Sequence, residues 1–456
     1  MTGNGTSATD LDARRRWGPF AAVQGLRPDG EVPQVCPVRR HRADLPREPD
    51  AYAAARAALQ PLASRVQSGD RIAVTAGSRG ISDIATVVKA AVDWLADVGA
   101  QPFVVPSMGS HGGATADGQR EVLAGLGITE ETMGVPVRAT MDTVVVGHLG
   151  GGVPIHHDRE VAEADGVLLV NRVKPHTDFH GPVESGLAKI LAIGLGNHRG
   201  AATMHAGGIA ALGGCVVEAA RTLVGQGRVL GGLAIMENAH EETAAVELLP
   251  ADGIAAPEES ALLDRARTLL GMLPFDDLDV LVVDEMGKDK SGTGMDTNVL
   301  GRCWVPNVPE FETPNINVVT VHRLSPDSHG NATGLGLADV MPLAMLEQID
   351  IRASYVNGLT SGAGGARRSR MPMMMEDDEA AILAAIAMSG RRDRAQLRLA
   401  RIHDTLSTSD LLVSAALLDE VEAHPELEVL GKPVPLVDGT VLGAWPAALT
   451  RTEERV

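Results

Sequence analysis

Short β-rich runs alternate with stretches of helical periodicity along most of this 456-residue chain. The run RIAVTAG at 71–77 is typical of a buried strand, and the apolar residues after it, from Ile84 to Val98, recur at helical spacing. The alternation then repeats, with further strands expected at 101–107, 166–173, 228–238, 278–285 and 315–324. This order of elements predicts an α/β fold with largely parallel sheets.

Two such α/β cycles are separated by a Pro-, Ala- and Gly-rich segment at 248–258. A chain of this length is expected to form two or three domains. We therefore expect a flexible N-terminal tail at 1–30, an N-terminal α/β domain at 31–255 and a C-terminal α/β domain at 256–456, with the active-site cleft between the two domains. The remaining helices are expected at 115–126, 205–223, 336–347 and 377–405, whereas 410–418 fits a strand or a helix.

Charge and cysteine usage exclude several classes of protein. The net charge of −19 argues against nucleic acid as the main partner, because phosphate binding needs a basic surface. The three cysteines, Cys36, Cys215 and Cys303, are far apart and form no CxxC, so neither a disulfide framework nor a zinc ribbon is expected. No apolar run is long enough to span a membrane, and no apolar segment of a signal peptide follows the early arginines. We expect a cytoplasmic protein.

Three loops with polar side chains follow the first three expected strands. They read AGSRGIS (76–82), PSMGSHGGATADG (106–118) and NRVKPH (171–176). Ligands of parallel α/β sheets bind beyond the carboxyl ends of the strands, so neighbouring strands would bring Arg79, His111 and His176 to one crevice. Helix N-termini after the first two loops would favour a phosphate or a carboxylate there.

The stretch from 170 to 205 holds four histidines, at 176, 180, 198 and 205, and two lysines, at 174 and 189. Each residue alone has an ordinary explanation. A lone histidine is more often a surface or satisfied core residue, and Lys189, which stands among apolar residues, can extend its amine to the surface. Together, at the ends of strands, these residues indicate a site.

In the order of its polar residues the chain resembles the LarA-like family of nickel-pincer-nucleotide-dependent lactate racemases and related 2-hydroxy-acid racemases and epimerases. The resemblance covers most of the chain and is clearest in the first domain. MGSHGG offers His111 and KPHTDFHGPVESGLAK offers His176 for the two catalytic histidines of the family.

The same resemblance implies a cofactor, a nickel pyridinium-3,5-bisthiocarboxylic acid mononucleotide. Lys189 in GLAKILAIGLG matches the lysine that is covalently joined to this cofactor, and His205 in GAATMHAG matches the histidine that ligates nickel. Ser78 and Arg79 in AGSRG match the loop that binds the cofactor phosphate. Soft donors together with one imidazole suit square-planar nickel.

The implied reaction is racemisation or epimerisation of a 2-hydroxy acid by reversible hydride transfer to the cofactor. Two histidines serve as acid and base, one for each enantiomer, and imidazole suits this because its ordinary pKa is about 6.5. The substrate carboxylate needs a cation, for which Lys288, Lys290 and Arg172 are candidates. Expected partners are the small-molecule substrate and the proteins that make and load the cofactor, and an oligomer is compatible with the sequence.

Two other functions stay open from the sequence. A metal-dependent hydrolase or lyase would use the region of His176, Asp178 and His180, although the chain has neither GxSxG nor HExxH. A non-catalytic protein would bind nickel or an organic anion without turnover. Lys189 separates these alternatives, because only the racemase needs it covalently loaded.

Overall fold

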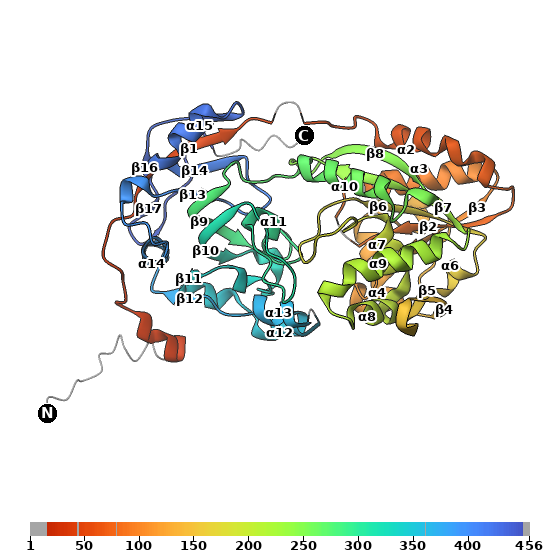
Figure 1. The fold of residues 1–456 in the computed structure, drawn as a ribbon, viewed down its shortest axis with the longest axis horizontal. Helices are drawn as coiled ribbons and strands as arrows, with labels where there is room; N and C mark the ends of the chain where they lie inside the picture. The colour runs from red at the N-terminus through yellow and green to blue at the C-terminus, as the bar shows by residue number, and fades with distance from the viewer. Residues whose placement is uncertain (1–15, 43–44, 79, 361, 450–456) are drawn as a thin grey trace. The chain divides into compact units, whose positions relative to one another are not determined.

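The computed structural model describes residues 16–42, 45–78, 80–360 and 362–449, which form two compact units (Figure 1). The N-terminal unit is Asp44–Leu270, and the C-terminal unit combines Met1–Ala43 with Gly271–Val456. Both are mixed α/β units with large, mostly parallel sheets, as the alternating pattern predicts. The expected cleft between the domains stays a prediction.

The division between the units differs from the expected one at two places. It lies at 270/271 rather than 255/256, because α10 (Pro257–Leu269) packs on the N-terminal unit, where its buried Glu259 accepts hydrogen bonds from the backbone of Ala188 and Ala255. Residues 31–43 join the C-terminal unit, because β1 (Gln34–Arg40) pairs with β14 (Asp410–Ser414).

The expected tail at 1–30 is partly structured. Residues 1–15 lie outside the described part of the chain, but 18–23 form a 3₁₀ helix. Arg27 forms ion pairs with Asp377 and Glu379, so the described part of this segment is attached to the C-terminal unit.

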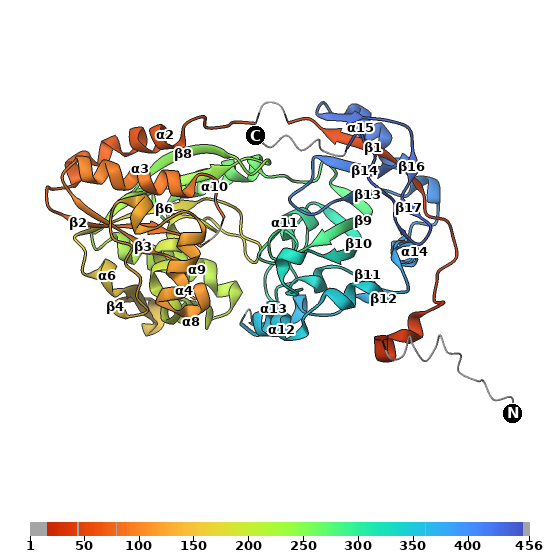
Figure 2. The same ribbon diagram turned by 180° about the vertical axis from the view of Figure 1, so that it is seen from behind.

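The N-terminal unit is built on a five-stranded sheet with the order β3-β2-β6-β7-β8. The first four strands are parallel and β8 is antiparallel to β7. Figure 2 shows α2 and α3 beside this sheet. The strands are β2 (Arg71–Ala76), β3 (Gln101–Pro106), β6 (Gly166–Arg172), β7 (Val229–Glu237) and β8 (Thr243–Pro250).

Alternate residues of these strands enter two separate cores, as the period of a strand requires. Ile72 and Val74 face α2 (Ala51–Leu59) and α3 (Ile84–Asp97). Ala73 and Leu169 belong to the opposite core, with α7, α9 and α10. The other helices of this unit are α4 (Ala116–Gly125), α5 (Glu130–Met133), α6 (Arg159–Ala162), α7 (Leu187–Ala192), α8 (Asn197–His205) and α9 (Ile209–Val224), and a hairpin is formed by β4 (Thr143–His148) and β5 (Pro154–Asp158).

The C-terminal unit holds a nine-stranded sheet with the order β12-β11-β10-β9-β13-β14-β1-β15, with β16 beside β1. Strands β12 to β13 in this order are parallel, and β14, β1 and β15 are antiparallel additions. The elements are β9 (Asp277–Met286), α11 (Thr297–Leu300), β10 (Asn315–Leu324), β11 (Val340–Pro342), α12 (Ile351–Thr360), α13 (Gly362–Arg368), β12 (Met373–Met375), α14 (Asp378–Met388), β13 (Leu399–Ile402), β14, α15 (Leu418–Ala423), β15 (Leu427–Val429), β16 (Val434–Pro435), β17 (Val437–Asp438) and β18 (Val441–Leu442).

Three expectations for this unit need correction. The helix expected at 336–347 is a short strand, β11, between two 3₁₀ turns. The helix expected at 377–405 ends at Met388, and β13 follows at Leu399. The ambiguous run at 410–418 begins as β14 and ends in a 3₁₀ turn. Among the described residues, no helix is long and apolar enough to cross a membrane.

Candidate active site

The first two strand-end loops of the N-terminal unit are joined by a hydrogen bond. Ser78 follows β2 and His111 follows β3, and these strands are parallel neighbours. The Ser78 hydroxyl lies 2.5 Å from Nδ1 of His111. When that Nδ1 carries the proton, Nε2 keeps its lone pair and the imidazole is a base at that atom. Arg79 lies outside the described residues, so its expected role stays a prediction.

The loop that carries His111 also contacts the segment that carries Lys189. The Gly109 amide donates to the carbonyl of Gly194 over 3.0 Å, and the buried Ser107 hydroxyl donates to the carbonyl of Ile190 over 3.1 Å. Lys189 is half-buried in the middle of α7, directly before Ile190. The His111 loop and the Lys189 helix therefore belong to one packed region.

His176 lies in the loop between β6 and α7, and a buried carboxylate holds this loop in shape. Glu184 accepts hydrogen bonds from the amides of His176 (2.6 Å) and Gly181 (3.1 Å), and it pairs with Nδ1 of His180 (3.1 Å). Arg267 of α10 donates to the same carboxylate over 2.6 Å. These four partners compensate a charge that would be costly to bury alone.

The His176 ring is itself oriented by two contacts. It stacks on Phe179 with 4.4 Å between the ring centroids, and its Nδ1 accepts a hydrogen bond from the Asp178 amide over 3.0 Å. An Nδ1 that accepts a hydrogen bond has no proton, so the neutral ring carries its proton on Nε2. In this arrangement His176 presents a donor at Nε2, whereas His111 is able to present an acceptor.

His205 is the last residue of α8 and is exposed. Its Nδ1 lies 2.7 Å from the carbonyl oxygen of Ala201, to which it donates. The hydrogen bond leaves the lone pair of the neutral ring on Nε2, the arrangement that protein imidazoles use to ligate metals. Ala201 in turn lies beside the His111 loop, because a Cβ added to Gly109 would be 3.3 Å from the Ala201 Cβ.

The start of α8 is fixed by a buried polar pair that the sequence did not reveal. The Asn197 side chain donates to Asp158 over 2.8 Å and to the carbonyl of Thr140 over 2.8 Å. Burial raises the pKa of Asp158 to about 6, although the hydrogen bond from Asn197 acts in the opposite direction. Asn197 has φ 50° and ψ −158°, a backbone conformation outside the left-handed helical region that non-glycine residues rarely adopt. This pair anchors the helix that ends in His205.

The sequence did not indicate that Asn171 and Glu184 hold the loop after β6 in place. The Asn171 amide, at the end of β6, donates to the carbonyl of Gly186 over 3.0 Å. A Cβ on Gly77 would lie 3.3 Å from the Asn171 Oδ1, so the loop that follows β2 passes close to β6. Their signal in the sequence is weak, because one amide and one carboxylate among glycines and prolines fit many loops equally well.

The three candidates for binding the substrate carboxylate all have partners within the protein. Arg172 forms an ion pair with Glu237. The Lys288 amine donates to the carbonyl of Gly292 over 2.5 Å. Lys290 lies 3.4 Å from Glu285, 3.3 Å from Asp289 and 3.6 Å from Asp404. Their roles toward a substrate stay predictions.

The hydrolase alternative gains no support from the described residues. Within 16–42, 45–78, 80–360 and 362–449 no group of three or more His, Cys, Asp or Glu side chains is arranged to hold a metal ion. His180 pairs with Glu184. The pincer hypothesis takes a single imidazole from the protein, so it does not depend on such a group.

Comparison with known proteins finds likeness in structure but not in sequence. No protein-family model matches the chain. No curated protein matches it. One similar solved structure is the lactate racemase apoprotein of Thermoanaerobacterium thermosaccharolyticum, with 12% identity over 82% of this chain and 89% of that chain and a TM-score of 0.42. A structural-genomics protein of Thermotoga maritima has 15% identity over 60% of this chain and 71% of that chain, with a TM-score of 0.44.

Proposed function

We propose that the chain is an isomerase that racemises or epimerises a 2-hydroxy acid. The observation that carries the proposal is the double attachment of the His111 loop, to Ser78 on one side and to the Lys189 segment on the other. This attachment joins the loop of His111 to the segment that holds Lys189, and both segments follow strands of one parallel sheet. The ends of such strands are where α/β proteins bind their ligands.

The imidazoles of His111 and His176 have different roles in this proposal. His111 takes the hydroxyl proton of the substrate at Nε2 while its Nδ1–H is held by Ser78. His176 donates from Nε2 to a substrate oxygen and steadies the charge that develops there. To form the opposite enantiomer, the oxygen must regain a proton as hydride returns. His176 supplies this proton from Nε2 when both of its ring nitrogens are protonated, which requires release of the bond that its Nδ1 accepts from the Asp178 amide.

The described residues fit the nickel-pincer nucleotide that the sequence implies. Lys189 offers an amine for the covalent link, and His205 offers Nε2 because its Nδ1 is held by Ala201. When bound, the cofactor supplies a hydride acceptor, which avoids a carbanion beside the carboxylate. The chain itself supplies the proton transfers and the orientation of the substrate.

The test is intact-protein mass spectrometry with metal analysis, on protein made in a host that synthesises the pincer cofactor. We expect a mass increment on the peptide that holds Lys189 and nickel near one equivalent. Lys189→Ala should lose both, whereas Lys432→Ala, which changes an exposed lysine of the C-terminal unit, should keep both. An unmodified Lys189 without nickel, in a host shown to load a known racemase, would exclude the pincer mechanism.

A second measurement reports on the reaction. Loaded protein is incubated with a panel of single-enantiomer 2-hydroxy acids that carry deuterium on the α carbon. Hydride transfer predicts that the opposite enantiomer forms and keeps its deuterium, since the hydrogen never becomes a solvent-exchangeable proton. Loss of deuterium to water at the rate of racemisation would indicate proton abstraction instead.

A further inference from the structure

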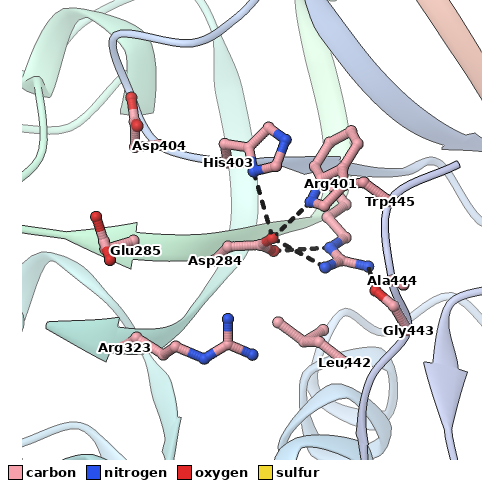
Figure 3. Close-up of a pocket in the computed structure, with 10 residues that line it drawn as sticks. All are labelled: Asp284, Glu285, Arg323, Arg401, His403, Asp404, Leu442, Gly443, Ala444 and Trp445. Carbon is pink, nitrogen blue, oxygen red and sulfur yellow. Dashed lines mark hydrogen bonds and ion pairs between the residues drawn. The ribbon is translucent and has the colours of Figure 1, made fainter. Parts of the chain in front are cut away.

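Carboxylates in the interior of this chain are paired with cationic side chains at several places. In a cavity of about 340 Å³ within the C-terminal unit, Arg401 donates two hydrogen bonds to Asp284, over 2.7 and 2.8 Å, and the Trp445 indole adds a third over 2.7 Å (Figure 3). The lining Glu285 lies 3.4 Å from Lys290. Because these carboxylates have partners within the protein, they shape the cavity without indicating a ligand.

Glu259 of α10 is a buried carboxylate in a different environment. It is 1% exposed, and none of the described lysines, arginines or histidines lies within ion-pair distance of it. Oε1 accepts a hydrogen bond from the Ala188 amide over 2.9 Å, Oε2 accepts one from the Ala255 amide over 2.8 Å, and the Leu187 amide donates to the same carboxylate. Burial raises the pKa of Glu259, and the three amides act in the opposite direction. Backbone amides alone therefore stabilise this charge.

Two of these amides belong to the start of α7, the helix that holds Lys189. The first amides of a helix have no partner within the helix, and a side chain just before the helix commonly accepts from them. The residue before α7 is Gly186, which has no side chain to do this. Since Leu187 and Ala188 are fully buried, their amides need a partner within the protein. Glu259 caps α7 from a position 71 residues after Ala188.

This cap depends on a glycine at position 186. A Cβ on Gly186 would lie 2.4 Å from Oε1 of Glu259, a distance at which one of the two groups must move. The backbone of Gly186, with φ −179°, is extended and open to other residues, so the carboxylate is what excludes a side chain there. The Gly186 carbonyl also accepts a hydrogen bond from the Asn171 side chain at the end of β6. The start of α7 is thus held between β6 and α10.

These contacts determine where the Lys189 side chain begins. Lys189 directly follows Ala188, so a displacement of that backbone moves the Cα from which the lysine extends. α7 has six residues, and a helix of this length has little stability of its own. The first turn of α7 therefore depends on Glu259, and the direction of the half-buried Lys189 side chain depends on that turn.

We propose that Glu259 is a positioning residue for Lys189, because it fixes the start of α7 and so directs the lysine amine toward the group that the amine binds. The inference rests on the proposed function for the identity of that group, the pincer cofactor. The position of the amine is a property of the unloaded chain and is measured there.

Limited acetylation of the unloaded full chain with acetic anhydride, followed by peptide mass spectrometry, tests the proposal. The rate at Lys189 is divided by the rate at the exposed Lys432 of the same sample. Glu259→Gln should accelerate acetylation of Lys189 about 3- to 10-fold, the effect of one lost hydrogen bond on the opening of α7. Glu258→Gln changes the exposed neighbour on the same helix and should leave the rate unchanged. Circular dichroism checks that each variant is folded.

Gly186→Ala tests the same contact while the carboxylate is kept. Its Cβ displaces Oε1 of Glu259, so acetylation of Lys189 should accelerate as in Glu259→Gln. In combination with Glu259→Ala, which leaves no carboxylate for the Cβ to displace, Gly186→Ala should add little. Glu259→Asp keeps the charge on a side chain shorter by a methylene group and should restore part of the original rate. A general loss of packing would produce neither the non-additive pair nor the rescue.

Loading with the cofactor separates this inference from the proposed function. In a host that makes the pincer cofactor, Glu259→Gln should carry a smaller mass increment on Lys189 than Glu258→Gln does. If neither the unaltered chain nor any variant acquires the increment, the proposed function is wrong, while the acetylation rates still decide the role of Glu259. The inference is wrong if Glu259→Gln and Glu258→Gln acetylate Lys189 at the same rate, or if the effects of Gly186→Ala and Glu259→Ala simply add.

Discussion

Each of three histidines in the N-terminal unit is oriented by one hydrogen bond, and its proposed role depends on that bond. His111 is oriented by Ser78, His176 by the Asp178 amide and His205 by the Ala201 carbonyl. The sequence indicated His111 and His176 from their place after strands and from the family resemblance, and His205 from the resemblance alone. It could not indicate their tautomers, because these depend on backbone groups that only the folded loops bring close.

Removing the Ser78 hydroxyl should affect catalysis more than folding. Ser78→Ala frees the His111 ring, so we expect kcat of the loaded protein to fall about 10- to 100-fold, the usual effect of losing a hydrogen bond that orients an imidazole. KM and the melting temperature should change little, and Ser78→Thr should restore part of kcat. Steady-state kinetics and thermal unfolding check this, and an unchanged kcat for Ser78→Ala would remove Ser78 from the site.

Buried His157 predicts how stability depends on pH. Burial, with a smaller contribution from Arg228, lowers the pKa of His157 from 6.5 to about 4. The unfolded chain binds this proton more readily, so this group does not reduce stability above pH 6.5, and stability falls progressively as the pH is lowered from 6.5 to about 4. The shift corresponds to roughly 3 kcal/mol.

Denaturant unfolding of the full chain at several pH values tests this expectation. His157→Leu should flatten the dependence of the unfolding free energy on pH between 6.5 and 4. The matched control is His148→Leu, which replaces an exposed histidine of the adjoining strand and should keep the original slope. Equal slopes for the two variants would contradict the assignment to His157.

At the scale of elements, the sequence predicted the strands that are long enough to show a hydrophobic pattern. The strands β2, β3, β6, β7, β9 and β10 lie within a residue or two of their expected positions. β11 and β13 were missed because three or four buried residues are too few to show a period. β1 was missed because its partners β14 and β15 are hundreds of residues away, and pairing at that distance leaves no local pattern.

The loop from Lys174 to Ser185 should depend on Glu184. Glu184→Gln places an amide group where one of the backbone amides of His176 and Gly181 now donates, and removes the buried negative charge that pairs with Arg267. We expect a loss of about 3 kcal/mol of stability and faster hydrogen exchange in this loop. Glu163→Gln, an exposed carboxylate of the same unit, is the control and should change neither. Unchanged exchange in Glu184→Gln would show that the loop is held by other contacts.

At the scale of the whole molecule, the two units differ in continuity. The N-terminal unit is a single segment, whereas the C-terminal unit needs β1 from the start of the chain between β14 and β15. We expect residues 44–270 expressed alone to unfold cooperatively, as seen by circular dichroism. Residues 271–456 alone should be poorly folded, and joining 16–43 to them through a flexible linker should restore a cooperative transition. A cooperative transition of 271–456 without β1 would contradict this.

The place of β1 also determines the order in which the chain is assembled during synthesis. Arg39 and Asp410, which pair across β1 and β14, are 371 positions apart, so their strands leave the ribosome roughly 20 to 70 seconds apart at about 5 to 20 residues per second. The N-terminal unit is completed within that interval. The first strand to be translated is therefore among the last to find its neighbours, and until then its unpaired edge is exposed to other nascent chains and to chaperones.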